Sequence, residues 1–295
     1  MSDRACVVGP GRAGLSLGYA LHQAGALESL VYCGRHPEPP AHPLFIEGTA
    51  RYRFGLDRPE PGTTVVLLTV PDDALPQIAH ALAAQGLAPG RCVALHCSGT
   101  LSGDVLAPLH ERGYQVGSLH PLQSLAHPVS GAERLPGLWF SVSGEAEALA
   151  AARRLVAPLS GGTLQIPVTR RPLYHAAAAV ASNYLPVLLA TAARLMVHAG
   201  VADQGAVPAL IPLMRGTLEN IDELGLARAL TGPVARGDLE TVRSHIRSLP
   251  DREAALYRVL GGEAVRVAEA QGLDTEAAAA LRALLGAETR AVPLG

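Results

Sequence analysis

Residues 5–25 read ACVVGPGRAGLSLGYALHQAG and are the most informative stretch of the chain. The order predicts a short apolar strand, a turn with glycines at positions 9, 11 and 14, and an amphipathic helix. In such a turn Gly9 permits the tight bend, Gly11 lets the backbone approach a pyrophosphate, and Gly14 lets the helix pack closely on the strand. The free N–H groups at the start of the helix would then hold the phosphates of a dinucleotide, and a glycine-rich turn without a ligand is the alternative. The predicted phosphate-binding residues are Gly9, Pro10, Gly11, Arg12, Ala13 and Gly14.

Composition narrows the class of protein. The 295 residues are enough for two domains, and a formal net charge of −2 leaves no basic footprint for a nucleic-acid partner. No membrane span is expected, because the most apolar window, residues 173–200, contains polar and charged side chains and suits a buried helix better. The four cysteines (Cys6, Cys33, Cys92 and Cys97) form no Cys-x-x-Cys pair, which favours a reduced, cytoplasmic protein. Every one of the 24 basic residues is arginine, so lysine chemistry is excluded.

Strands and helices alternate through the first half of the chain. The expected strands are 6–8, 30–33, 65–70, 92–95, 116–119 and 140–142, and the expected helices are 12–23, 73–84, 101–112 and 145–157. Because the strands are unbroken apolar runs, this α/β alternation predicts a doubly wound parallel sheet with helices on both faces.

The pattern changes after Gly161-Gly162. One more strand is possible at 163–166, and only helices follow, at 173–199, 204–224, 239–249, 252–270 and 274–285. We therefore divide the chain into a dinucleotide-binding Rossmann domain, residues 1–165, and a helical substrate and dimerisation domain, residues 166–295. The helix at 173–199 is apolar almost all round, which predicts that it is buried in a core or against a second subunit of a homodimer.

The second strand is followed by Gly34, Arg35 and His36. NAD sites usually carry an acidic residue here for the ribose 2′-hydroxyl, whereas an arginine can hold a 2′-phosphate. NADP is therefore the expected cofactor, with NAD possible, and the alternative is that Arg35 is a solvated loop residue. Further cofactor contacts are expected where other strands end, at Thr69, Val70, Pro71, His96 and Cys97.

Polar side chains end two further strands. His120 is the best acid–base candidate because histidine titrates near neutrality, and His96 and His127 are its rivals. Gln123, which follows closely, is a candidate for substrate binding. Ser98 either orients the substrate or caps the next helix. A metal is not expected, because the spacing of these histidines and Cys97 matches no metal site.

The helical half adds a polar stripe and a loop. His175, Ser182 and Asn183 fall on one face of an apolar helix, so they face a cavity, a polar partner or water. A satisfied core histidine with a helix–helix hydrogen bond is the alternative. The loop 230–238 is either a connector or a substrate-binding lid, in which Arg236 could bind a carboxylate.

These segments resemble those of Rossmann-like oxidoreductases that carry a C-terminal helical domain of unknown function. The matching segments are 9–14, 96–99, 118–123, 174–184 and 230–238. The wider relatives so implied are pyrroline-5-carboxylate reductase, ketopantoate reductase, deazaflavin-dependent NADP reductase and prephenate dehydrogenase. The resemblance implies a helical domain like that of 6-phosphogluconate dehydrogenase, often used to dimerise. It also implies that His120 handles a substrate hydroxyl proton, as the similar His-Pro turn does in prephenate dehydrogenases.

The chain departs from those relatives in one respect. Hydroxyacid dehydrogenases and ketopantoate reductases place a lysine followed by an asparagine on this helix, where the present chain has His175 and Asn183. No substrate is therefore carried over from them.

Together these features predict a cytoplasmic, NADP-dependent oxidoreductase. A hydride would move between the nicotinamide and a small carbonyl or imine substrate in the cleft between the domains. His120 or His175 would exchange the proton, and Asn183 and Ser98 would orient the substrate. The alternatives are a dinucleotide-binding sensor or interaction module without turnover, and a nonredox use of bound NAD.

Overall fold

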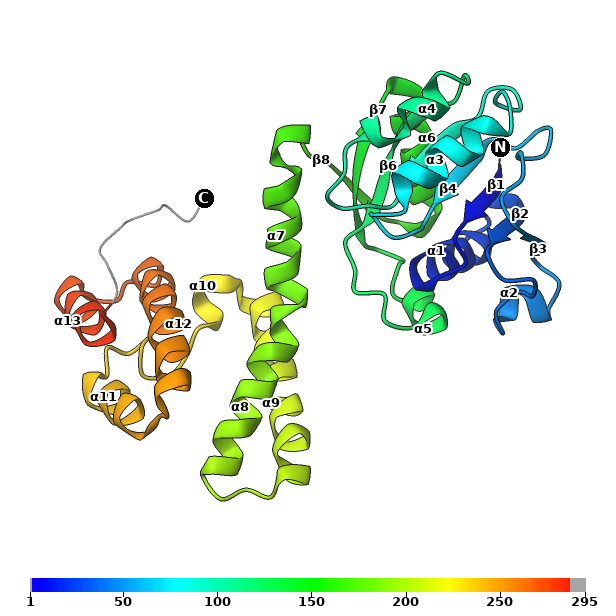
Figure 1. Cartoon of the computed structure of the whole chain (residues 1–295). Helices are drawn as coiled ribbons and strands as arrows, with labels where there is room; N and C mark the ends of the chain where they lie inside the picture. The colour runs from blue at the N-terminus through cyan, green and yellow to red at the C-terminus, as the bar shows by residue number, and fades with distance from the viewer. Residues whose placement is uncertain (1, 287–295) are drawn as a thin grey trace. The chain divides into compact units, whose positions relative to one another are not determined.

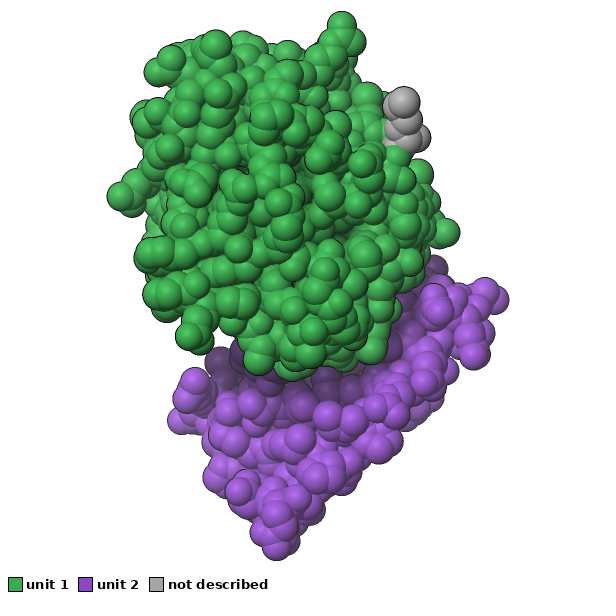
Figure 2. Space-filling model, turned by 90° about the vertical axis from the view of Figure 1, so that its right-hand side faces the viewer, with its two compact units in different colours: residues 1–182 green, residues 183–295 purple. Residues whose placement is uncertain are grey.

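The computed structural model describes residues 2–286. The chain divides into two compact units, residues 1–182 and residues 183–295 (Figure 2). The boundary expected from the sequence lay earlier, between residues 165 and 166. Helix α7 (Arg171–Ser182) belongs with the first unit, because Arg171 at its start is hydrogen-bonded to residues of the sheet.

The first unit is built on one sheet of eight strands in the order β3-β2-β1-β4-β5-β6-β7-β8 (Figure 1). The strands are β1 (Asp3–Val8), β2 (Leu27–Gly34), β3 (Arg51–Phe54), β4 (Val65–Leu68), β5 (Val93–His96), β6 (Gln115–Pro121), β7 (Trp139–Gly144) and β8 (Gly162–Gln165). Successive strands are added on one side of β1 as far as β3 and on the other side from β4 onward. This reversal creates the switch point at which open α/β sheets bind ligands.

The predicted doubly wound parallel sheet is confirmed, and it has one antiparallel pair: β7 runs antiparallel to β6, with β8 parallel to β7. The connection from β6 to β7 contains only one short helix, α5 (Pro128–Glu133). That helix packs beside the first turns of α1 (Arg12–Gln23), where the Ser16 hydroxyl donates to the Pro128 carbonyl at 2.9 Å. The chain thus stays near the edge where β6 ends, and it re-enters the sheet in the opposite direction without a crossover.

Helices cover both faces of the sheet. They are α1, α2 (Pro43–Ile46), α3 (Leu75–Ala84), α4 (Ala107–His110), α5 and α6 (Ala146–Val156). Because side chains alternate along a strand, the sheet has two separate cores: Val7 packs in one cluster with α1 and α6, and Val8 packs in the other with α3 and α4. The helix expected at 101–112 is instead a 3₁₀ turn at Gly103–Leu106 followed by α4, which has Pro108 in its first turn.

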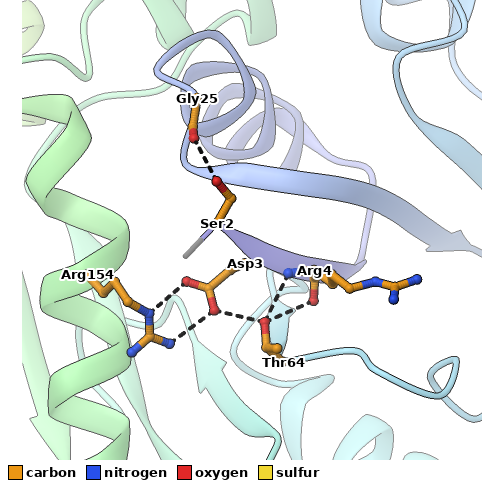
Figure 3. Close-up of polar contacts among 6 residues, drawn as sticks. All are labelled: Ser2, Asp3, Arg4, Gly25, Thr64 and Arg154. Atoms are coloured by element: carbon orange, nitrogen blue, oxygen red, sulfur yellow. Dashed lines mark hydrogen bonds and ion pairs between the residues drawn. The ribbon is translucent and has the colours of Figure 1, made fainter.

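An ion pair between buried Asp3 and half-exposed Arg154 joins the first strand to α6, a helix that packs on β5, β6 and β7 (Figure 3). The carboxylate of Asp3 accepts two hydrogen bonds of 3.0 Å from Arg154 of α6 and one of 2.8 Å from the Thr64 hydroxyl. The same hydroxyl oxygen accepts the backbone N–H of Arg4 at 2.9 Å. Asp3 is buried, and a buried carboxylate without a partner would destabilise the fold. The hydrogen bonds from Arg154 therefore stabilise the charged form of Asp3.

The second unit is helical: α8 (Tyr184–His198), α9 (Asp203–Leu224), α10 (Leu226–Ala229), α11 (Leu239–Ser248), α12 (Asp251–Ala270) and α13 (Thr275–Leu285). Its buried core lies among the last three helices and includes Val242, Val265 and Leu281. Gly200 and Gly272 follow the ends of α8 and α12, and both adopt positive φ, +97° and +96°.

Within residues 2–286, one helical stretch, Val168–His198, is long and apolar enough to cross a membrane by length and composition alone. Its mean hydropathy is 1.5, and 6% of its most apolar window is buried. The sequence analysis expected the helix at 173–199, within this stretch, to be covered by protein. A protein interior and a membrane both favour apolar side chains, so the same composition suits either environment.

Candidate functional site

Two of the three glycines after β1 are required by the protein's own packing. Gly9 has φ of +103°, and its carbonyl accepts a hydrogen bond of 2.7 Å from the Thr69 hydroxyl. A Cβ on Gly14 would lie 2.3 Å from the Gly9 oxygen and 2.4 Å from the Thr69 hydroxyl oxygen. The turn and the close approach of α1 to the sheet therefore need glycine at both positions.

Gly11 differs from them. Apart from Gly11 and its two neighbours in the chain, no heavy atom of residues 2–286 lies within 4 Å of the position that a Cβ on Gly11 would take. Gly11 precedes α1, and within that described part no side chain caps the helix. The first N–H groups of α1 thus open onto space that internal packing does not explain, and a pyrophosphate approaching the backbone needs that space. The residues present fit the phosphates of a dinucleotide.

The end of β2 lies beside this turn, because β2 is the neighbour of β1. A Cβ on Gly34 would lie 2.4 Å from the Tyr52 hydroxyl oxygen, which donates to the His36 carbonyl at 2.5 Å. Arg35 and His36 are exposed. Two other arginines of this corner, on β3, are ion-paired with Glu60, whereas no ion pair within residues 2–286 involves Arg35.

His96 and Cys97 were both expected to touch a cofactor. In the structure the ring of His96 is hydrogen-bonded within the protein, and the thiol of Cys97 is held in its protonated form. The Nε2 atom of His96 lies 3.1 Å from the Ser102 carbonyl, and Nδ1 accepts the backbone N–H of Ser98 at 3.2 Å. Burial lowers the pKa of His96 to about 4, so the ring is neutral and structural. Burial also raises the pKa of Cys97 to about 12, which leaves an unreactive thiol.

Ser98 stabilises the loop that follows β5. Its hydroxyl donates to the Asp72 carboxylate at 2.7 Å and accepts the backbone N–H groups of Thr100 and Leu101 at 3.1 and 3.0 Å. This is the capping alternative considered for Ser98. Its one hydroxyl hydrogen is engaged by Asp72.

Arg171 is a residue that the sequence reasoning missed. It is fully buried at the start of α7 and donates to the hydroxyls of Ser118 and Ser143 at 3.1 and 3.0 Å and to the Ser98 carbonyl at 2.8 Å. No ion pair within residues 2–286 involves it. The only signal was an arginine beside Pro172 at the start of an apolar helix. Its function is to hold α7 against β6 and β7 while keeping a positive charge inside the protein.

Three aromatic side chains meet near Gly99. The Nδ1 atom of His120 lies 2.9 Å from the Tyr174 hydroxyl oxygen. The rings of His120 and His175 have centroids 6.3 Å apart. A Cβ on Gly99 would lie 2.9 Å from Nε2 of His120 and 2.8 Å from Nδ1 of His175. One ring nitrogen of each histidine therefore packs against Gly99, where a larger residue would displace both rings.

The electrostatics of His120 differ from the expectation. Burial, followed by the nearby His175 and Arg171, lowers the pKa of His120 to about 4, while Asp72 acts more weakly in the opposite direction. His120 therefore does not titrate near neutrality, and its ring is neutral at pH 7. Burial raises the pKa of Tyr174, which keeps its hydroxyl protonated.

Of the other predicted residues, Gln123 and His127 belong to the first unit, and Asn183 and Arg236 belong to the second. The Gln123 side-chain oxygen accepts the N–H of Ser124 at 2.8 Å, and His127 precedes α5. Asn183 precedes α8 in the second unit, and Arg236 is exposed in the loop before α11 of that unit.

The loop 230–238 is anchored within the second unit. Gly232 and Gly237 have φ of +93° and +71°, and Val234 between them is buried in the core of the unit. This geometry is what a connector needs. In the part of the chain that the structure describes, no three His, Cys, Asp or Glu side chains are grouped as a metal ion would require.

Comparison with known families defines the class of protein. Residues 3–121 match the model of the Rossmann-like domain, and residues 138–264 match that of a domain of unknown function, DUF2520. The chain thus combines a Rossmann-like domain with a C-terminal DUF2520 domain, as the resemblance in its motifs predicted. A comparison with curated proteins finds no match.

Solved structures share this fold over nearly the whole chain. A protein from Thermotoga maritima is similar at a TM-score of 0.70 and 22% identity, over 90% of this chain and 99% of that one. A protein from Bacteroides fragilis, provisionally named an NADP oxidoreductase, is similar at 0.68 and 20%, over 89% and 98%. Pyrroline carboxylate reductase from Plasmodium falciparum, solved with NADP bound, is similar at 0.58 and 11%, over 96% and 98%. At these identities the likeness establishes the shared fold.

Proposed function

We propose that this protein is an oxidoreductase that uses a nicotinamide dinucleotide, with NADP preferred, on a small carbonyl or imine substrate. One observation carries the proposal: the open glycine turn after β1 and the cluster of His120, Tyr174 and His175 lie toward the same edge of one parallel sheet. The carboxyl edge of such a sheet is where ligands bind and react. The similar Bacteroides fragilis protein carries the provisional name of an NADP oxidoreductase, and the Plasmodium falciparum reductase has NADP bound, which supports this choice of cofactor.

Each end of the dinucleotide has candidate partners. The N–H groups at the start of α1 would hold the pyrophosphate, and Arg12 in the first turn would add a positive charge. Arg35, which follows the strand next to the turn, would pair with a 2′-phosphate. When bound, the nicotinamide would supply or accept the hydride.

His120 is the proposed proton-transfer group. When the Tyr174 hydroxyl donates to Nδ1, the hydrogen of the neutral ring is on Nε2, the nitrogen that lies beside Gly99 and His175. A neutral imidazole can donate that hydrogen to a developing anion, and in the reverse direction it can take part in removing a hydroxyl proton. His175 is the competing candidate, because its ring reaches the same region.

We also propose a cytoplasmic homodimer formed by the helical unit. Apolar side chains of α8 and α9 are exposed in the single chain, including Val187 at 55%, Leu213 at 66% and Leu218 at 52%. Exposed apolar surface of this kind on adjacent helices is typical of an interface between subunits.

The test is NADPH oxidation measured against a panel of keto acids and cyclic imines, with NADPH binding measured by fluorescence on the same protein. Turnover with any member of the panel supports the proposal. Tight NADPH binding without turnover across the panel contradicts it and favours a dinucleotide-binding sensor.

A further inference from the structure

Two groups of opposite charge act on His120, and they differ in their exposure to water: Arg171 is buried and Asp72 is exposed. Arg171 of α7 is fully buried, and its hydrogen-bond acceptors are the hydroxyls of Ser118 and Ser143 and a backbone carbonyl, all without net charge. The opposing carboxylate is that of Asp72, which is exposed and accepts the Ser98 hydroxyl. Water screens an exposed charge far more than a buried one. The region beside His120 therefore has a positive electrostatic potential.

The remaining groups that face His120 do not reverse this potential. Tyr174 carries a protonated hydroxyl, and the ring of His175 adds a further positive charge whenever it is protonated. His96, on the neighbouring strand β5, is held neutral by burial. Among residues 2–286, the one carboxylate that acts on His120 is thus the exposed Asp72.

We propose that the site acts on the carbonyl–alcohol couple of an uncharged C=O group and discriminates against a protonated imine; this inference rests on the proposed oxidoreductase function. Reduction of a carbonyl builds negative charge on oxygen, which a buried arginine and an N–H donor stabilise. A protonated imine is a cation, so the same potential opposes its binding. It also has no lone pair with which to accept a hydrogen bond from Nε2 of His120.

The proton and electron balance closes through residues of the cluster. The carbonyl carbon gains one hydrogen and two electrons from the reduced nicotinamide dinucleotide, and the oxygen gains the proton on Nε2 of His120. Nδ1 takes the proton of the Tyr174 hydroxyl, so the ring stays neutral, and the tyrosinate is then protonated by water. Arg171 lowers the pKa of Tyr174, against the effect of burial, and so stabilises the transient tyrosinate. Alcohol oxidation follows the reverse path.

The first experiment compares ketones with cyclic imines of the same ring size as substrates for NADPH oxidation at pH 7. We expect kcat/KM at least about tenfold higher for the ketones. Faster turnover of the imines overturns this inference and leaves the proposed function standing. No turnover of either class by NADPH-bound protein overturns the proposed function, and the inference with it.

The second experiment is independent of turnover. The pKa of His120 is followed by NMR in histidine-labelled protein, and its signal is assigned by its loss in His120→Gln. Arg171→Met should raise that pKa by about one unit or more, because a buried cation is removed. Arg170→Met, which removes the adjacent exposed arginine, is the matched control and should leave the pKa unchanged. An unchanged pKa in folded Arg171→Met overturns the inference.

If Arg171→Met fails to fold, Tyr174→Phe supplies the decisive measurement. It keeps the ring of Tyr174 and removes the hydroxyl that donates to Nδ1. Ketone turnover should fall at least about tenfold while NADPH affinity stays within a few-fold. Ketone turnover equal to that of the wild type contradicts the proposed proton path.

Discussion

Nδ1 of His120 lies 2.9 Å from the hydroxyl oxygen of Tyr174, and this contact joins the end of β6 to helix α7, as does the hydrogen bond from Arg171 to Ser118. It selects the ring nitrogen that remains for a ligand. It also makes the acid–base behaviour of His120 depend on a residue far away in the sequence. The predictions below start from this pair and extend to the cofactor site and the subunit interface.

Replacing His120 should remove proton transfer and leave the cofactor in place. We expect His120→Ala to lower turnover by about a hundredfold or more, because a positioned acid or base contributes roughly 10²–10⁴ in rate. NADPH affinity should stay within a few-fold. His175→Ala is the comparison: if it abolishes turnover while His120→Ala is nearly normal, the roles are reversed.

Stability should depend on pH through the two buried histidines. His96 and His120 have pKa values of about 4 in the folded protein, below the usual value of 6.5. Between these values the unfolded chain binds protons that the folded protein does not, so the stability contributed by each neutral ring is present above pH 6.5 and is lost as pH falls toward 4. Urea unfolding from pH 7 to 4 should show a smaller decline for His120→Gln than for the wild type. His80→Gln, at an exposed histidine, should decline as the wild type does.

Cofactor choice should depend on Arg35. The chain should bind NADPH more tightly than NADH, and Arg35→Ala should erase the difference. A charge-assisted hydrogen bond is worth roughly 1.5–3 kcal/mol, so the loss should be about tenfold or more. Arg91→Ala, at an exposed arginine before β5, is the control. Equal affinities of the wild type for the two nucleotides would sink this prediction.

Two glycines of the same turn should behave differently when replaced by valine. Gly11 has φ of −84° and open space at its Cβ position, so Gly11→Val should fold normally and lose nucleotide affinity at least about tenfold. Gly14→Val would place side-chain atoms against Thr69 and Gly9, so it should destabilise the protein by about 1–3 kcal/mol or more. Thermal unfolding and NADPH titration of both variants check this, and normal NADPH binding by Gly11→Val would contradict the phosphate site.

The helical unit should dimerise through α8 and α9. We expect sedimentation to show a dimer at micromolar concentration. Leu213→Glu, at an exposed apolar position of α9, should produce monomers, because a charge buried in an apolar interface is costly. Glu219→Gln, at an exposed charge on the same helix, is the control. A monomeric wild type would refute the interface.

Elements specified by local chemistry were predictable. The turn at Gly9, the start of α1 at Arg12, and helices α9, α11, α12 and α13 follow from glycine conformations and hydrophobic periodicity, which neighbouring residues determine. The single helix expected at 173–199 is instead two helices, α7 and α8, and α10 was not expected. The expected helix at 252–270 differs from α12 by one residue at its start. The Gly-x-Gly-x-x-Gly pattern likewise predicts a cofactor site without reference to tertiary contacts.

The sequence by itself therefore determined the class of fold and most of its strands and helices, although not β3, α2 or α5, and it supplied the candidate site residues. Only the tertiary structure decided the direction of β7, the buried position of Arg171 and the neutral state of His120. The physical reason is the same for all three. Strand direction, burial and pKa are set by groups that meet through folding, such as Arg171 and Ser118, and no periodicity in a sequence encodes which distant side chains will surround a given atom.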